Sequence, residues 1–138
     1  MKLHKELIRK VNFRGESFEV KVTVKYKWDG YQRLEKHFEA SPTTIDKMYR
    51  KIIDGEAKFL TILVEAESDG IRGSDCLGTV LIDDWYTVDS CVEENKMMNV
   101  AIEDLLKQMG YIYTDLEEYL SPVSFIVATE TLRAGELM

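Results

Sequence analysis

The stretch from Thr87 to Gly110 constrains the fold most strongly, because it has the clearest helical period in the chain. Ser90 and Glu93 have the spacing of a capping box, and Gly110 supplies a residue that readily adopts positive φ. Charged residues lie mainly off the apolar stripe, which comprises Cys91, Met98, Ile102, Leu105 and Met109. The pattern predicts one amphipathic helix whose apolar side covers a sheet.

The residues from Phe18 to Trp28 alternate strictly between apolar and polar side chains. This period is typical of a strand that buries one face and exposes the other. A preceding strand over Glu6–Phe13 is predicted to pair with it through a connection at residues 14–17, which places Val11 opposite Val20.

A third strand is predicted to follow the second. Asp29 and Gly30 indicate a tight turn, after which residues 31–39 would return along the sheet. A two-residue turn would put charged side chains on the apolar face. We therefore favour a bulged three-residue turn, which puts Leu34 and Phe38 there.

The middle of the chain predicts a helix and a second hairpin. Ser41 and Pro42 are typical of a helix start, and the helical pattern continues to Asp54. Two short segments rich in β-branched residues, Lys58–Ala66 and Leu77–Trp85, are predicted as paired strands, although the period of the first also fits a short helix.

The C-terminal part has a weaker pattern. A short helix is predicted at Thr114–Glu117, and Val123–Thr129 is predicted as a last strand. The order is strand, strand, strand, helix, strand, strand, helix, followed by this C-terminal piece. Hairpin connections indicate an antiparallel sheet of about five strands with helices packed on one face. We therefore predict a single α+β domain over residues 1–138, frayed after about residue 130.

Composition favours a water-soluble protein. The chain carries 25 acidic and 18 basic residues, for a formal net charge of −7. It contains no apolar run of the ~20 residues that a bilayer requires and no secretory signal pattern, so we expect a cytoplasmic protein without a membrane segment. Cys76 and Cys91 lack the spacing of a disulfide or metal motif, and we expect free thiols.

Known catalytic motifs are not found in the sequence. It has no nucleophile elbow, no zinc-binding helix motif and no glycine-rich phosphate loop. Its two histidines, His4 and His37, are far apart in the chain. Neither a cofactor nor a metal is expected, and an enzyme with an unrecognised pocket is the least favoured functional hypothesis.

Two segments in the middle of the chain have alternative interpretations. Residues 68–75 fit either an ordinary surface turn or a mobile functional loop with Arg72 at its tip. Residues 83–86 fit either a polar strand end with a core tryptophan or an anchor for a partner. Adjacent strand residues point to opposite faces, so Asp83 and Asp84 are not expected to bind one ion.

Charge is segregated along the chain. Residues 1–53 carry a net charge of +6, residues 54–94 carry −9, and residues 95–138 carry −4. Segregation of this kind favours oriented association with a charged partner. The alternative is that the acidic residues maintain solubility and that the basic and acidic parts neutralise each other after folding.

We predict a non-enzymatic protein-binding domain whose acidic face docks on a basic surface, as in inhibitor or immunity proteins, including virus-encoded ones. The predicted partner-binding residues are Glu65, Glu67, Asp69, Arg72, Asp75, Asp83, Asp84, Trp85 and Tyr86, and the acidic face extends to Asp89, Glu93 and Glu94. The alternative is nucleic-acid, nucleotide or small-ligand binding by the basic face of the first hairpin, which comprises Lys21, Lys25, Lys27 and Arg33. A homo-oligomer is also compatible with the sequence.

Overall fold

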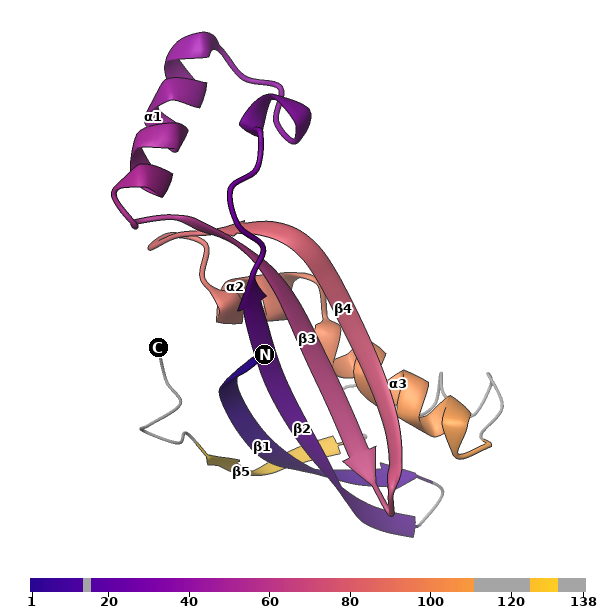
Figure 1. Cartoon of the computed structure of the whole chain (residues 1–138). Helices are drawn as coiled ribbons and strands as arrows, with labels where there is room; N and C mark the ends of the chain where they lie inside the picture. Colours follow the sequence, from indigo (N-terminus) through magenta and orange to yellow (C-terminus); the bar gives the residue numbers. More distant parts are fainter. Residues whose placement is uncertain (14–15, 111–124, 132–138) are drawn as a thin grey trace.

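A computed structural model describes residues 1–13, 16–110 and 125–131. The elements in chain order are β1 (Lys2–Phe13), β2 (Glu16–Trp28), the 3₁₀ helix η1 (Leu34–Lys36), α1 (Pro42–Ile53), β3 (Lys58–Ser68), β4 (Ile71–Ile82), α2 (Val88–Glu94), α3 (Met97–Gln108) and β5 (Phe125–Thr131). The strands form one antiparallel sheet in the order β4-β3-β2-β1-β5 (Figure 1). The predicted α+β class is confirmed.

The first hairpin forms, but its predicted register is wrong by two residues. Val11 lies opposite Phe18, and Val20 lies opposite Arg9. The reason is that the strands extend to Phe13 and Glu16, which pair directly, so the connection is shorter than predicted. A shift of two residues keeps each side chain on its predicted face, because strand side chains alternate with a period of two.

The predicted third strand at residues 31–39 is wrong, because the place beside β2 is taken by β3. The chain instead leaves the sheet after Trp28 and forms η1. Asp29 marks this departure: its N–H donates to the Phe59 carbonyl at 2.9 Å, and its carboxylate accepts from Thr61 Oγ1 at 2.8 Å and from the Thr79 N–H at 3.0 Å. One side chain therefore ties the end of β2 to β3 and β4.

The helix predicted over residues 87–110 is broken into α2 and α3. Lys96 adopts a left-handed conformation with φ 51°, which interrupts the helix. The N-cap of α2 is Thr87, whose side chain accepts a hydrogen bond from the Ser90 N–H. The predicted Ser90–Glu93 capping box is therefore wrong. The break also changes the helical phase, and Met97 is buried in place of the predicted Met98.

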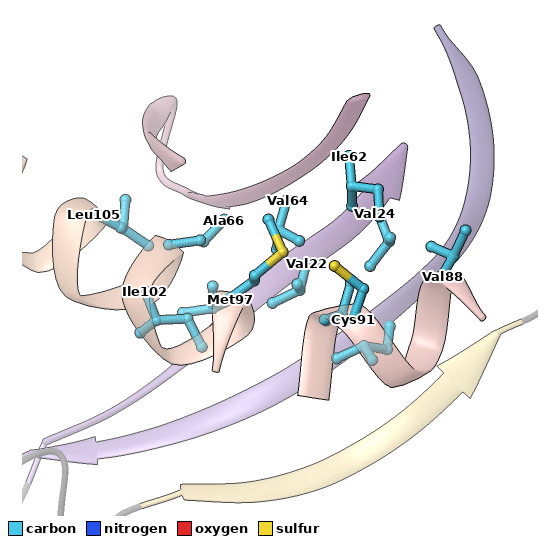
Figure 2. Close-up of a cluster of buried hydrophobic side chains, with 14 of the residues drawn as sticks. Val22, Val24, Ile62, Val64, Ala66, Val88, Cys91, Met97, Ile102 and Leu105 are labelled. Carbon is cyan, nitrogen blue, oxygen red and sulfur yellow. The ribbon is translucent and has the colours of Figure 1, made fainter. Parts of the chain in front are cut away.

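The main core lies between the sheet and these two helices (Figure 2). Alternate residues of β2 and β3 face Cys91, Met97 and Ile102, as the strand period predicts. The helix α3 lies so close to β4 that a Cβ atom on Gly73 would come within 2.1 Å of the Leu105 backbone nitrogen. Glycine is therefore the residue that permits this approach.

The helix α1 is not part of that layer. It packs with η1 into a second cluster that contains Leu34, Ile45, Ile52, Ala57 and Phe59. Phe59 and its neighbour Leu60 belong to different clusters, as expected for adjacent strand residues on opposite faces. We call residues 29–57 the arm; α1 within it lies beyond the ends of the strands in Figure 1. Of the α-helices in the described residues, α2 and α3 thus occupy the predicted helix face and α1 does not.

The hairpin of β3 and β4 is tighter than predicted. Ser68 pairs with Ile71, and the two residues between them, Asp69 and Gly70, have φ values of 51° and 77°. These values are typical of a two-residue hairpin turn. Residues 71–75 therefore belong to a strand, which excludes the interpretation of residues 68–75 as a mobile loop.

At its other end, β4 stops at Ile82 and not at Trp85 as predicted. The last predicted strand is confirmed as β5, which pairs with β1, whereas the predicted helix at Thr114–Glu117 lies outside the described residues. No helix in the described part of the chain has the length and apolar character needed to cross a membrane.

Candidate partner-binding site

The predicted partner-binding residues do not form one surface. Glu65, Glu67 and Arg72 lie near the β3–β4 turn, whereas residues 83–86 follow the other end of β4. Figure 1 shows that the β3–β4 turn and the C-terminal end of β4 lie at opposite ends of the sheet. At about 3.3 Å per residue, the length of β4 separates them by roughly 35 Å.

At the hairpin end, the acidic residues are paired with basic ones. Lys25 Nζ lies 2.7 Å from Glu65 Oε1, and Arg72 lies 3.3 Å from Glu65 and 3.1 Å from Glu67. The Lys25 hydrogen bond holds the pKa of Glu65 below its ordinary value. Asp69 is exposed in the turn. Two of the carboxylates predicted for docking, Glu65 and Glu67, are therefore neutralised within the protein.

Asp75 also differs from the prediction. It is half-buried, and it lies opposite Val64, which is a residue of the main core. Burial raises the pKa of the Asp75 carboxyl above its ordinary value. Its position makes Asp75 a poor candidate for a solvent-exposed docking residue.

The basic face proposed as the alternative is interrupted by carboxylates. Lys21 and Lys25 lie on the same side of β2, but Lys21 contacts Glu6 at 3.2 Å and Lys25 contacts Glu65. Lys27 is exposed farther along the strand. Arg33 lies in the arm, because the third strand that was predicted to align it with the lysines does not form.

The connection between β4 and α2 is a loop closed by Asp83. The Asp83 N–H donates to the Tyr86 carbonyl at 3.0 Å, and its Oδ1 accepts from the backbone N–H groups of Trp85 and Tyr86 at 2.8 Å each. This arrangement leaves Trp85 88% exposed, so the alternative of a core tryptophan is wrong. Trp85 is thus a large apolar side chain that faces solvent on a loop held by backbone hydrogen bonds to Asp83.

The neighbouring Tyr86 has a structural role. It is half-buried and packs against the main core. A hydrogen bond to Glu94, together with burial, raises the pKa of the Tyr86 hydroxyl. The two adjacent aromatic residues therefore differ: Tyr86 holds the loop to the body of the protein, and Trp85 faces solvent.

A groove of about 450 Å³ runs beside this loop. We call it the acidic groove. It is lined by the apolar or aromatic residues Tyr26, Leu60, Ile82 and Val88, by His4 on β1, by Gly55, Glu56 and Lys58 after α1, and by Asp83, Asp84, Thr87 and Asp89 around the start of α2. It therefore lies where the arm, the strand ends and the helix layer meet.

The carboxylates of the acidic groove have different partners. Asp89 Oδ1 lies 3.0 Å from His4 Nε2 and 3.1 Å from Lys5 Nζ. Burial acts to raise the pKa of Asp89, but these hydrogen bonds outweigh it and hold the pKa below its ordinary value. Glu56 and Asp84 are exposed, and neither forms an ion pair with any residue that the structure describes. They are the carboxylates available to a ligand.

The sequence interpretation missed part of this site. The sequence pattern of Tyr26 indicates only a strand residue, and nothing local to Glu56 indicates that the turn after α1 lies beside residues 83–89. In the sequence, only Asp83, Asp84 and Trp85 indicate an acidic and aromatic site in this region.

Among the described residues, no group of three or more histidine, cysteine, aspartate or glutamate side chains is arranged to hold a metal ion. Comparisons with protein-family models, characterised proteins and solved structures found no match to the chain.

Proposed function

We propose that the protein is a binding domain that engages a protein partner with a basic surface, and that the partner contacts the loop of residues 83–87 and the acidic groove. The observation that carries the proposal is the 88% exposure of Trp85 on a loop closed by the Asp83 hydrogen bonds. Tryptophan, with tyrosine and arginine, is enriched among the residues that dominate binding energy at protein interfaces.

Charge around the loop supports a basic partner. Asp84 and Glu93 are exposed near Trp85 along the chain, and Asp89 and Glu94 are also exposed, although Asp89 contacts His4 and Lys5 and Glu94 is hydrogen-bonded to Tyr86. Exposed carboxylates around an aromatic anchor form a polar rim, which accelerates encounter with a positively charged surface. An ordered loop also reduces the conformational entropy that binding would otherwise cost.

The type of partner follows from the same surface. Inhibitor and immunity proteins present acidic residues to the basic active-site or nucleic-acid channels of their targets, and this site has that combination of charge and aromatic surface. Nucleic acid is the weaker candidate, because Lys21 and Lys25 of the predicted basic face are paired with Glu6 and Glu65.

Affinity capture with the wild-type protein and with Trp85→Ala tests the proposal. We expect a partner that the wild type retains and the variant loses, with affinity reduced by about thirtyfold, the effect of an interface residue worth about 2 kcal/mol. Tyr31→Ala is the matched control, since Tyr31 is also exposed but lies in the arm and not in the loop of residues 83–87. Equal capture by the wild type and Trp85→Ala would contradict the proposal.

A further inference from the structure

We infer that the acidic groove receives an arginine side chain of the partner. The inference rests on the proposed function and specifies the chemical group that the partner inserts. It is drawn from the volume of the groove, from its lining residues and from Glu56 and Asp84, whose carboxylates form no ion pair within residues 1–13, 16–110 and 125–131.

The groove has the size and lining required by a long amphipathic side chain. Its volume of about 450 Å³ is within the range of small-molecule sites in proteins. The half-buried Ile82 contributes apolar surface on which the aliphatic part of an arginine can pack, and the buried Leu60 lies beside it in the lining. Tyr26 contributes an aromatic ring, and a guanidinium group binds favourably over such a ring.

The charges of the groove select a cation. Glu56 lies in the turn after α1 and Asp84 lies in the loop before α2, so the carboxylates come from two separate segments. Lys58 is the lysine of the groove lining, and His4 already contacts Asp89. The carboxylates therefore outnumber the positive charges, which opposes the entry of a phosphate or a carboxylate ligand.

Arginine fits this arrangement better than lysine. Its planar guanidinium can donate two hydrogen bonds to one carboxylate while it stacks on an aromatic ring. A lysine ammonium carries the same charge, but it is more strongly hydrated and lacks the planar shape. The combination of Tyr26 with Glu56 and Asp84 therefore predicts a preference for arginine at equal charge.

The test is an NMR titration of the ¹⁵N-labelled protein with the blocked tripeptide Gly-Arg-Gly, and with the same tripeptide carrying lysine or citrulline. We expect saturable shifts of the Ile82, Asp84 and Val88 amides with arginine, binding at least about threefold weaker with lysine, and no saturable shift with the uncharged citrulline. Equal affinity for arginine and lysine, or no saturable shift with arginine, would overturn the inference.

Paired variants locate the site. Glu56→Gln with Asp84→Asn should weaken arginine binding by at least about fivefold, because charge-assisted hydrogen bonds are lost. Glu67→Gln with Asp69→Asn makes the same change in net charge at the far end of β4 and should leave binding unchanged. An equal loss in both pairs would show that only net charge matters and would overturn the inference.

The partner found by capture separates this inference from the proposed function. If its affinity depends on Trp85 but not on Glu56 and Asp84, the function stands and the arginine site is wrong. If its affinity is indifferent to Trp85, the proposed function itself is wrong, whatever the tripeptide titration shows.

Discussion

At the scale of single residues, the approach of α3 to β4 depends on Gly73. A Cβ atom at this position would lie 2.1 Å from Leu105 N and 2.5 Å from Ala101 O, both of them backbone atoms of α3. Gly73→Ala should therefore displace the helix and lower the free energy of unfolding by about 3 kcal/mol. Chemical denaturation measures this change.

Gly78 provides the control for that substitution. It lies on the same strand, and a Cβ atom there would meet Thr61 Oγ1 at 3.8 Å, which is ordinary contact. Gly78→Ala should change stability by less than about 1 kcal/mol. Equal stabilities of the two variants would show that α3 does not cross β4 at Gly73.

The ion pair of Lys25 and Glu65 predicts a dependence on pH. The hydrogen bond from Lys25 lowers the pKa of Glu65 below its ordinary value of 4.5. Folding therefore favours the ionised carboxylate, and this stabilisation is present above pH 4.5 and lost as pH falls through the folded-state pKa. Glu65→Gln should lose less stability than the wild type on acidification, as measured by thermal melts across the acidic range.

Lys25→Gln tests the cause of that pKa shift. Like Glu65→Gln, this variant should lose less stability than the wild type on acidification, because Lys25 is the main source of the lowered pKa of Glu65. If both variants lost as much stability on acidification as the wild type, the Lys25–Glu65 pair would not be the source of the pH dependence.

At the scale of secondary-structure elements, α3 is held by its buried side. Ile102 is fully buried between the sheet and the helix layer, whereas Val100 on the same helix is 39% exposed. Ile102→Ala should lower the free energy of unfolding by about 2–5 kcal/mol through cavity formation. Val100→Ala should cost less than about 1 kcal/mol, and similar losses in urea denaturation would show that the helix is oriented differently.

The arm has its own small core, so it should be able to unfold separately. Leu34 is fully buried in the second cluster, and its N–H donates to Tyr49 Oη at 3.1 Å. Leu34→Ala should reduce the hydrogen-exchange protection of α1 while the amides of β2 and β3 keep theirs. The exposed Tyr31→Ala is the control. Uniform loss of protection would show that the arm and the sheet unfold as one unit.

At the scale of the whole molecule, the two ends of β4 should contribute unequally to partner binding. They are separated by roughly 35 Å, which is several times the screening length of about 8–10 Å at physiological salt. Glu56→Lys with Asp84→Lys should slow association by at least about tenfold, and more strongly at low salt. Stopped-flow measurements at two ionic strengths test this expectation.

Charge reversal at the hairpin end is the matched comparison. Glu67→Lys with Asp69→Lys makes the same change in net charge, but Glu67 already faces Arg72 and lies far from Trp85. This pair should slow association by less than about threefold. If the hairpin pair had the larger effect, the docking surface would lie at the β3–β4 turn instead.

Local patterns in the sequence were sufficient for the elements with a strong period. The alternation from Phe18 to Tyr26, the start of α1 at Ser41 and Pro42, and most of the apolar side of residues 88–106 were predictable, whereas Trp28 is exposed and Met97 is buried in place of Met98. The reason is that side-chain period and helix capping act over a few neighbouring residues. These features were enough to establish the α+β class.

Pairing partners, side-chain environment and the location of the site were decided by the tertiary structure. The pairing of β2 with β3 excluded the third strand, and the left-handed Lys96 divided the long helix, although neither outcome has a local signal. Glu56 and Asp84 line one groove because folding brings the turn after α1 beside the loop before α2. Distant segments compete for the same sheet edge and for the same core. A local sequence pattern does not indicate which of these contacts forms.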